Sequence, residues 1–154
     1  MTAPAPDLDD ILQRLEAARA ELTETLKSAD PDRFDKDNVD GESVKRTIER
    51  TADDLNFYYG RLAARALNLP QPPCLSRAEF SSLREATVSL QVAHRRFSNL
   101  LHDLVPGDLD RVASEDDNPQ YTLRQVLEMA AAHYKLRAQQ VKLLSATTIS
   151  RRKR

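Results

Sequence analysis

The residues with the clearest capacity for chemistry are a histidine and an arginine in the segment 121–144. His133 and Arg137 are four positions apart, so on a helix they lie one turn apart on the same side. Both fall inside or beside a stripe of apolar residues that recur at three- and four-residue steps, which is typical of a buried helix face. The stripe consists of Leu123, Val126, Leu127, Ala130, Tyr134, Val141 and Leu144. Arginine is seldom buried unless it is paired. We therefore expect Arg137 to be largely buried and paired.

A second set of polar side chains belongs to the helix predicted over 44–67. Arg50 and Asp54 lie along one flank of its apolar stripe, four positions apart, and can form an ion pair there. On a surface such a pair contributes only a few tenths of a kcal/mol. Tyr58 is one turn further along the inner face, and its hydroxyl, or that of Tyr59, is a candidate donor to a ligand. These residues add a cation, a carboxylate and a hydroxyl to the candidate pocket.

A third candidate is the histidine of the segment 76–104. His94 takes a position on the apolar stripe of this predicted helix. A histidine in such a position is either a core residue whose nitrogens bond to a carbonyl or carboxylate, or a pocket residue that faces His133. The sequence leaves both interpretations open.

Four amphipathic helices are needed to position these side chains. Helical periodicity predicts them over 7–27, 44–67, 76–104 and 122–146. Their expected N-caps are Asp7, Ser43, Ser76 and Thr122, the last two in capping boxes completed by Glu79 and Gln125. Each helix is apolar on one face only, so all four can close around one core. The expected fold is an all-α four-helix bundle with long loops between helices one and two and between helices three and four.

The chain of 154 residues is most simply one domain. We expect a flexible leader over 1–6, the bundle over 7–146, and a basic tail over 147–154 that ends in RRKR. The loop 28–42 is rich in aspartate, but its spacing does not follow the calcium loop of an EF-hand and no glutamate occupies the closing position. A solvated linker is therefore the expected role of this loop.

Composition narrows the function classes. Lys and Arg number 23 against 24 Asp and Glu, a formal net charge of -1, which argues against nucleic acid as the main partner. The single Cys74 cannot form an internal disulfide and fits a reducing compartment. The N-terminus lacks the pattern of a signal peptide, and no run of ~20 apolar residues predicts a membrane span. We expect a cytoplasmic protein that does not bind membranes.

Two stretches resemble the DinB/YfiT-like superfamily of four-helix bundles. The first, GESVKRTIERTADD at 41–54, is similar to the W-S-V-x-x-x-x-x-H-x-A-D opening of that family's second helix. The second, YTLRQVLEMAAAHYKLRAQQV at 121–141, is similar to the family's threonine-capped last helix with its H-x-x-x-H pair. The order of helices and the two long loops also agree, so the resemblance covers nearly the whole predicted domain.

The resemblance implies a metal site that this chain has lost. In that family three histidines bind a divalent metal, and some members use it to activate a thiol cofactor. By position those ligands fall at Arg50, His133 and Arg137, and the family's tryptophan falls at Glu42, so His133 is the one retained ligand. Arginine stays protonated and has no lone pair to offer a metal. We expect a degenerate site without a cofactor. The alternative is zinc or nickel in a rebuilt site that uses His94, His133 and a carboxylate.

Two arginines at one site require negative charge. Either an internal network with Asp54, Glu128 or another acidic residue supplies it, or the pocket binds a small anionic ligand such as a carboxylate or phosphate. Two fixed positive charges would also keep His133 mostly neutral near pH 7. The resulting hypothesis is a DinB-like protein without catalytic activity, or one that binds an anionic small molecule. The alternatives are a metal- or thiol-dependent transferase or isomerase with a rebuilt site, and an interaction module that acts as a homodimer.

Overall fold

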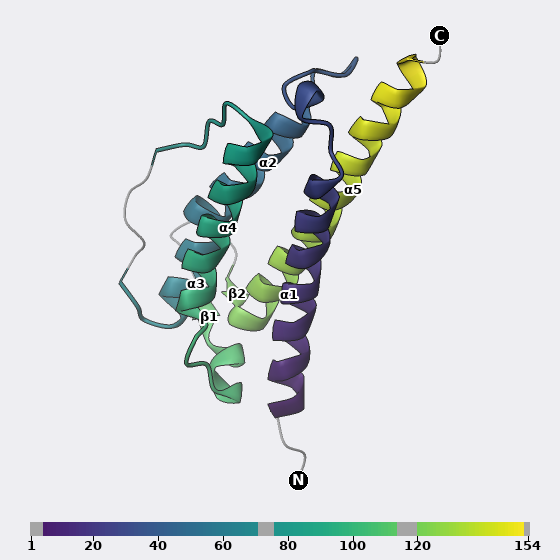
Figure 1. Ribbon diagram of the computed structural model, residues 1–154. Coiled ribbons are helices and arrows are strands. Elements are labelled where there is room, and N and C mark those ends of the chain that lie inside the picture. The colour runs from purple at the N-terminus through teal and green to yellow at the C-terminus, as the bar shows by residue number, and fades with distance from the viewer. Residues whose placement is uncertain (1–4, 71–75, 114–119, 153–154) are drawn as a thin grey trace.

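The computed structural model describes residues 5–70, 76–113 and 120–152 (Figure 1). Within these ranges the chain forms four helical rods, two short 3-10 turns and one strand pair. The rods are α1 (Ala5–Lys27), the continuous run of α2 (Val44–Asp54), η2 (Leu55–Tyr59) and α3 (Gly60–Ala66), then α4 (Leu83–Leu100) and α5 (Leu123–Arg152). The all-α four-helix bundle predicted from the sequence is confirmed.

The four rods surround one core. The helices α1 and α5 lie side by side, and α2, η2 and α3 pack between α4 and α5 (Figure 1). The predicted stripe of α5 lies in the core, where Leu123, Val126, Leu127 and Val141 have no exposed surface. Within the described residues no helix combines the length and the apolar composition that crossing a membrane requires.

Two of the predicted helix starts are confirmed by their capping hydrogen bonds. The Ser43 hydroxyl accepts from the Arg46 amide at 3.1 Å at the start of α2. At the start of α5 the Thr122 hydroxyl accepts from the Gln125 amide at 3.2 Å, and the Gln125 side chain accepts in return from the Thr122 amide at 2.9 Å. These local bonds satisfy amides that a helix leaves without partners, so they define both starts.

The predicted start of the third helix at residue 76 is wrong. The helix α4 begins at Leu83, where the Ser82 hydroxyl accepts from the Glu85 amide at 3.1 Å. The preceding segment 76–80 lies along α2 instead. Its amides donate to carboxylates of that helix, Ala78 to Asp53 and Phe80 to Glu49, both at 2.8 Å.

The predicted loops and termini contain more regular structure than expected. The turn η1 (Pro31–Arg33) lies in the first loop, and η3 (Pro106–Asp110) lies in the second. The antiparallel strands β1 (Val112–Ala113) and β2 (Tyr121–Thr122) lead into α5, with Val112 opposite Thr122. The helices α1 and α5 reach into the segments 1–6 and 147–154 that were expected to be a leader and a tail, while Cys74 lies outside the described residues.

One wide turn interrupts the second rod. At η2 the Gly60 amide bonds to the carbonyl of Leu55, five residues earlier, which is the pattern of a π turn. Tyr59 is buried there, with 3% of its surface exposed, whereas Tyr58 is 41% exposed. The sequence predicted an uninterrupted helix with Tyr58 on its inner face, and the structure places Tyr59 there instead.

Candidate functional site

Four of the six predicted site residues, Arg50, Asp54, His133 and Arg137, lie along a line of polar side chains between the second rod and α5, whereas His94 and Tyr58 do not. We call this group the α2–α5 seam. It consists of Glu42, Arg50, Asp54, Tyr59, His133, Arg137 and Gln140.

Arg137 is the most buried cation of the seam, with 13% of its side chain exposed. Its Nη2 donates to Asp54 Oδ2 at 3.3 Å, and its Nη1 donates to Gln140 Oε1 at 3.1 Å. The expectation of a largely buried and paired Arg137 is confirmed. Its Nε is buried and has no acceptor within the described part of the chain. The guanidinium is therefore held by one charged and one neutral partner.

His133 lies one turn away and is half-exposed. Its Nδ1 contacts the Tyr59 hydroxyl and lies 3.9 Å from Asp54 Oδ2. Burial lowers the pKa of His133, Asp54 opposes that shift, and Arg137 adds to it. The expected direction is confirmed, but burial rather than the two arginines is the main cause.

The Tyr59 hydroxyl stays protonated in its contact with His133. Burial, with a contribution from Asp54, raises the pKa of Tyr59 well above its usual value. The phenol therefore keeps its proton while it forms a hydrogen bond with His133 Nδ1.

Arg50 does not join Asp54 as its position four residues away suggested. Its Nη2 lies 2.9 Å from Glu42 Oε1 and donates to Glu42 Oε2 at 3.1 Å. Asp54 instead pairs with Arg137, and Glu128 pairs with Arg14 at 3.7 Å. Each arginine of the seam thus has its own carboxylate, so the internal network is formed by Asp54 and Glu42 and does not include Glu128.

His94 belongs to a separate, buried cluster and does not face His133. Its Nδ1 lies 2.5 Å from the Tyr134 hydroxyl, and its Nε2 lies 3.1 Å from Ser98 Oγ. Glu16 Oε1 approaches Nε2 at 3.6 Å. The rotation of α5 turns Tyr134 toward α4 and turns the preceding His133 toward η2. Of the two interpretations of His94, the satisfied core residue is correct.

Sequence reasoning missed Gln140 and ranked Tyr58 above Tyr59. The signal for Gln140 was its position three residues after Arg137, which is within reach on a helix surface. Tyr58 packs edge-on against the ring of Tyr59, with centroids 5.0 Å apart, and it is Tyr59 that reaches His133.

The donor set of the seam does not fit a divalent metal. Among the described residues no three His, Cys, Asp or Glu side chains are grouped so that they could hold one. The two guanidinium groups offer no lone pair, and His133 Nδ1 is already hydrogen-bonded to the Tyr59 hydroxyl. A rebuilt site with His94 is also unfavourable, because both of its nitrogens already have partners in the core.

The order and packing of the helices define a YfiT-like four-helix bundle. Compared with solved structures, the chain is similar to YfiT from Bacillus subtilis, described as a probable metal-dependent hydrolase with an unusual four-helix bundle topology. The match has a TM-score of 0.70 and covers 91% of this chain and 86% of that chain at 20% sequence identity. No protein-family model and no curated protein matches the chain. At this identity the two proteins share the fold, and the hydrolase description stays with YfiT.

Replacement of Asp54 tests how much its ion pair with Arg137 contributes to the free energy of unfolding. We expect Asp54→Ala to lower the free energy of unfolding by about 1–3 kcal/mol, because the charged hydrogen bond is lost and the guanidinium stays buried. Arg137→Met removes that charge, so adding Asp54→Ala to it should cost little more. Chemical denaturation of the two single variants and the double variant measures the coupling. Glu128→Ala, which breaks an exposed pair, is the control and should change stability by less than about 0.5 kcal/mol. Strictly additive effects of Asp54→Ala and Arg137→Met would contradict the pairing.

The purified protein should contain no stoichiometric divalent metal. The physical reason is that arginine occupies two of the three ligand positions implied by the resemblance. Elemental analysis after purification without chelators measures zinc, nickel and iron per chain. One equivalent of any of these metals that disappears in His133→Ala would show that a rebuilt site exists.

The buried cluster of His94 should make stability depend on pH. Burial, with a contribution from Arg19, lowers the pKa of His94 from 6.5 to about 4, against the opposing effect of Glu16. The unfolded chain therefore takes up a proton first as pH falls. We expect the contribution of His94 to be complete above about pH 6.5 and to decline toward pH 4 by about 3 kcal/mol.

This contribution is measured as the difference between two stability curves. Urea unfolding of wild type and His94→Gln across pH 4–7 should show a steeper acid decline in wild type. His102→Gln, which removes an exposed histidine, is the matched control and should follow wild type. Parallel curves for wild type and His94→Gln would refute the assignment.

Proposed function

We propose that this chain is a metal-independent, non-catalytic protein of YfiT-like fold that binds a small anionic molecule beside Arg50. The supporting observation is a pocket of about 230 Å³ between the start of α2 and α5. Its lining consists of Asn38, Glu42, Thr47, Arg50, Gln140, Leu143 and Leu144. The pocket borders the partly buried Asp54–Arg137 pair through Gln140, so it lies beside the positions where the resemblance implies the metal ligands.

The polar groups that this pocket can offer a ligand are mostly donors. The Asn38 side-chain oxygen accepts from the amides of Asp40 and Glu42, both at 2.9 Å. The Gln140 oxygen accepts from Arg137. Because both amide oxygens are in use, the side-chain NH₂ groups of Asn38 and Gln140 are left to meet a ligand. With the Arg50 guanidinium they make a set of donors that suits a carboxylate or phosphate.

Within this donor set Glu42 contacts the Arg50 guanidinium. Both contacts of its carboxylate use Nη2 of Arg50, and 47% of the Arg50 side chain remains exposed. A ligand anion would compete with Glu42 for the guanidinium. Arg137 is less suited to this role, because Asp54 and Gln140 already hold it. The proposal therefore places the anion at Arg50 alone, whereas the sequence-based hypothesis placed it between Arg50 and Arg137.

The pocket also limits the size of the ligand. Drug-sized ligands usually need about 300–1,000 Å³, so about 230 Å³ suits a smaller molecule. Leu143, which is 66% exposed, and Leu144 supply an apolar wall. A short aliphatic carboxylate or a small phosphate ester meets both requirements.

Anion binding can be measured as a rise in melting temperature. We expect acetate, butyrate or phosphate to stabilise wild type relative to chloride at matched ionic strength, by ~2.7 kcal/mol at a hundredfold excess over Kd. Glu42→Gln removes the internal competitor and should increase the response, whereas Arg50→Gln should abolish it. Arg46→Gln, which removes an exposed arginine of the same helix, is the matched control.

Two outcomes would count against this proposal. Equal responses in Arg50→Gln and Arg46→Gln would show that the effect is not located at the pocket. A smaller response in Glu42→Gln would show that Glu42 helps to bind the ligand and does not compete with it. The alternative of an enzyme with a rebuilt site predicts a bound metal. The alternative of a homodimeric interaction module predicts twice the monomer mass in solution.

A further inference from the structure

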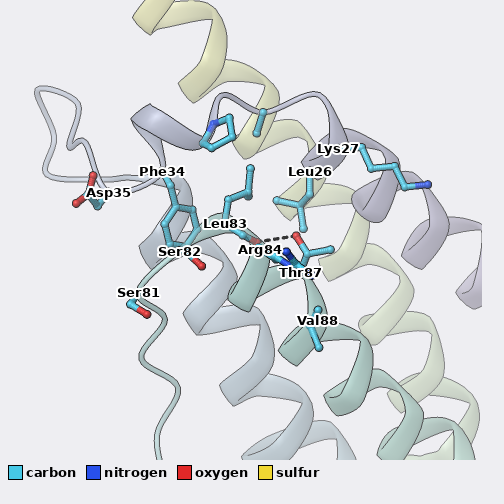
Figure 2. A pocket seen from close by; sticks show the side chains of 12 residues that line it. Leu26, Lys27, Phe34, Asp35, Ser81, Ser82, Leu83, Arg84, Thr87 and Val88 are labelled. Atoms are coloured by element: carbon cyan, nitrogen blue, oxygen red, sulfur yellow. Dashed lines mark hydrogen bonds between the residues drawn. The ribbon is translucent and has the colours of Figure 1, made fainter.

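A second and larger cavity lies at a different place in the bundle. It has a volume of about 570 Å³ and lies between the end of α1, the segment that carries η1, and the beginning of α4 (Figure 2). It shares no lining residue with the pocket beside Arg50. Its size falls within the range of about 300–1,000 Å³ that is usual for small-molecule sites.

The floor of this cavity is apolar. Leu26, Phe34 and Leu83 converge on it from three different segments (Figure 2). They are core residues with 1%, 3% and 9% of their surface exposed. Val88, one turn further along α4 and 54% exposed, extends the apolar surface outward. The cavity therefore suits an aliphatic chain.

Most polar groups at the rim are already used within the chain. The Ser82 hydroxyl caps α4, the Thr87 hydroxyl donates to the carbonyl of Leu83 at 2.8 Å, and Lys27 pairs with Glu24 at 2.9 Å. Arg84 differs, because it forms no ion pair or side-chain hydrogen bond with any described residue. Asp35, the acidic residue of the lining, lies well apart from Arg84 in Figure 2.

The exposed Arg84 lies at the end of α4 where the helix dipole favours an anion. It is the second residue of α4, and the positive end of a helix dipole disfavours a cation in the first turn. A carboxylate beside Arg84 would neutralise the guanidinium at the edge of the apolar floor. The apolar floor and the guanidinium at its edge together suit a ligand that has an aliphatic chain and an anionic group.

We propose that this cavity is a binding site for an amphiphilic anion, with the aliphatic chain on Leu26, Phe34 and Leu83 and the carboxylate at Arg84. The site is independent of the anion pocket beside Arg50. Longer chains should bind more tightly, because each buried CH₂ improves affinity by up to about fourfold.

The probe is decanoate below its micelle concentration, titrated into the full chain by calorimetry and compared with hexanoate and octanoate. We expect saturable binding that tightens with chain length. Arg84→Glu should weaken decanoate binding at least tenfold while the melting temperature stays the same or rises, because a glutamate suits the first turn of α4. Loss of affinity could then not be attributed to unfolding.

Two control variants locate the bound ligand. Arg95→Glu changes the charge of an exposed arginine on the same helix and should leave affinity within about twofold of wild type. Arg50→Gln should also leave it unchanged. Absence of saturable binding, equal loss in Arg84→Glu and Arg95→Glu, or loss in Arg50→Gln would each overturn the proposal. Equally tight binding of decanol would overturn the role of Arg84.

Discussion

A guanidinium that lies in the wall of a helix bundle needs a carboxylate beside it, and the pairing of Arg137 with Asp54 meets that need. Other contacts of the seam follow from this pair. Asp54 pairs with Arg137 and not with Arg50, and Arg50 pairs with Glu42. The second Nη of Arg137 holds the Gln140 oxygen, so the NH₂ group of Gln140 is left for the pocket. The guanidinium of Arg137 therefore engages both Asp54 and the Gln140 oxygen, and the proposed anion pocket can use only the NH₂ group of Gln140.

The resemblance implies that histidines of the second and last helices share a metal ion, which would tie those helices together. In this chain the same two elements are tied without metal, by the ion pair of Asp54 and by the bond from Tyr59 to His133. Glu42 and Arg50, for which the resemblance implies the tryptophan and first histidine positions, contact each other. The residues at these positions therefore pair with one another, and the fold is similar to that of YfiT.

The features that the sequence predicted are those that short-range spacing controls. The stripe of α5, the caps at Ser43 and Thr122, and the inward position of Arg137 all follow from neighbours within one or two turns. The rest depended on contacts between distant segments. The start of α4 moved because carboxylates of α2 take the amides of the segment 76–80. The partners of Arg50 and His94 depend on the path of a loop and on the rotation of α5, and the choice of Tyr59 over Tyr58 accompanies a π turn that the helical period does not reveal.

The side-by-side packing of α1 and α5 has a consequence for how the chain is made. These helices stand at opposite ends of the described sequence, so the apolar face of α1 lacks its main native partner until α5 has been synthesised. Domains whose main contacts join distant segments fold slowly and expose apolar surface while they wait. During translation Leu15, Leu22 and Leu26 of α1, which are almost fully buried in the finished bundle, would be the segment most in need of a chaperone.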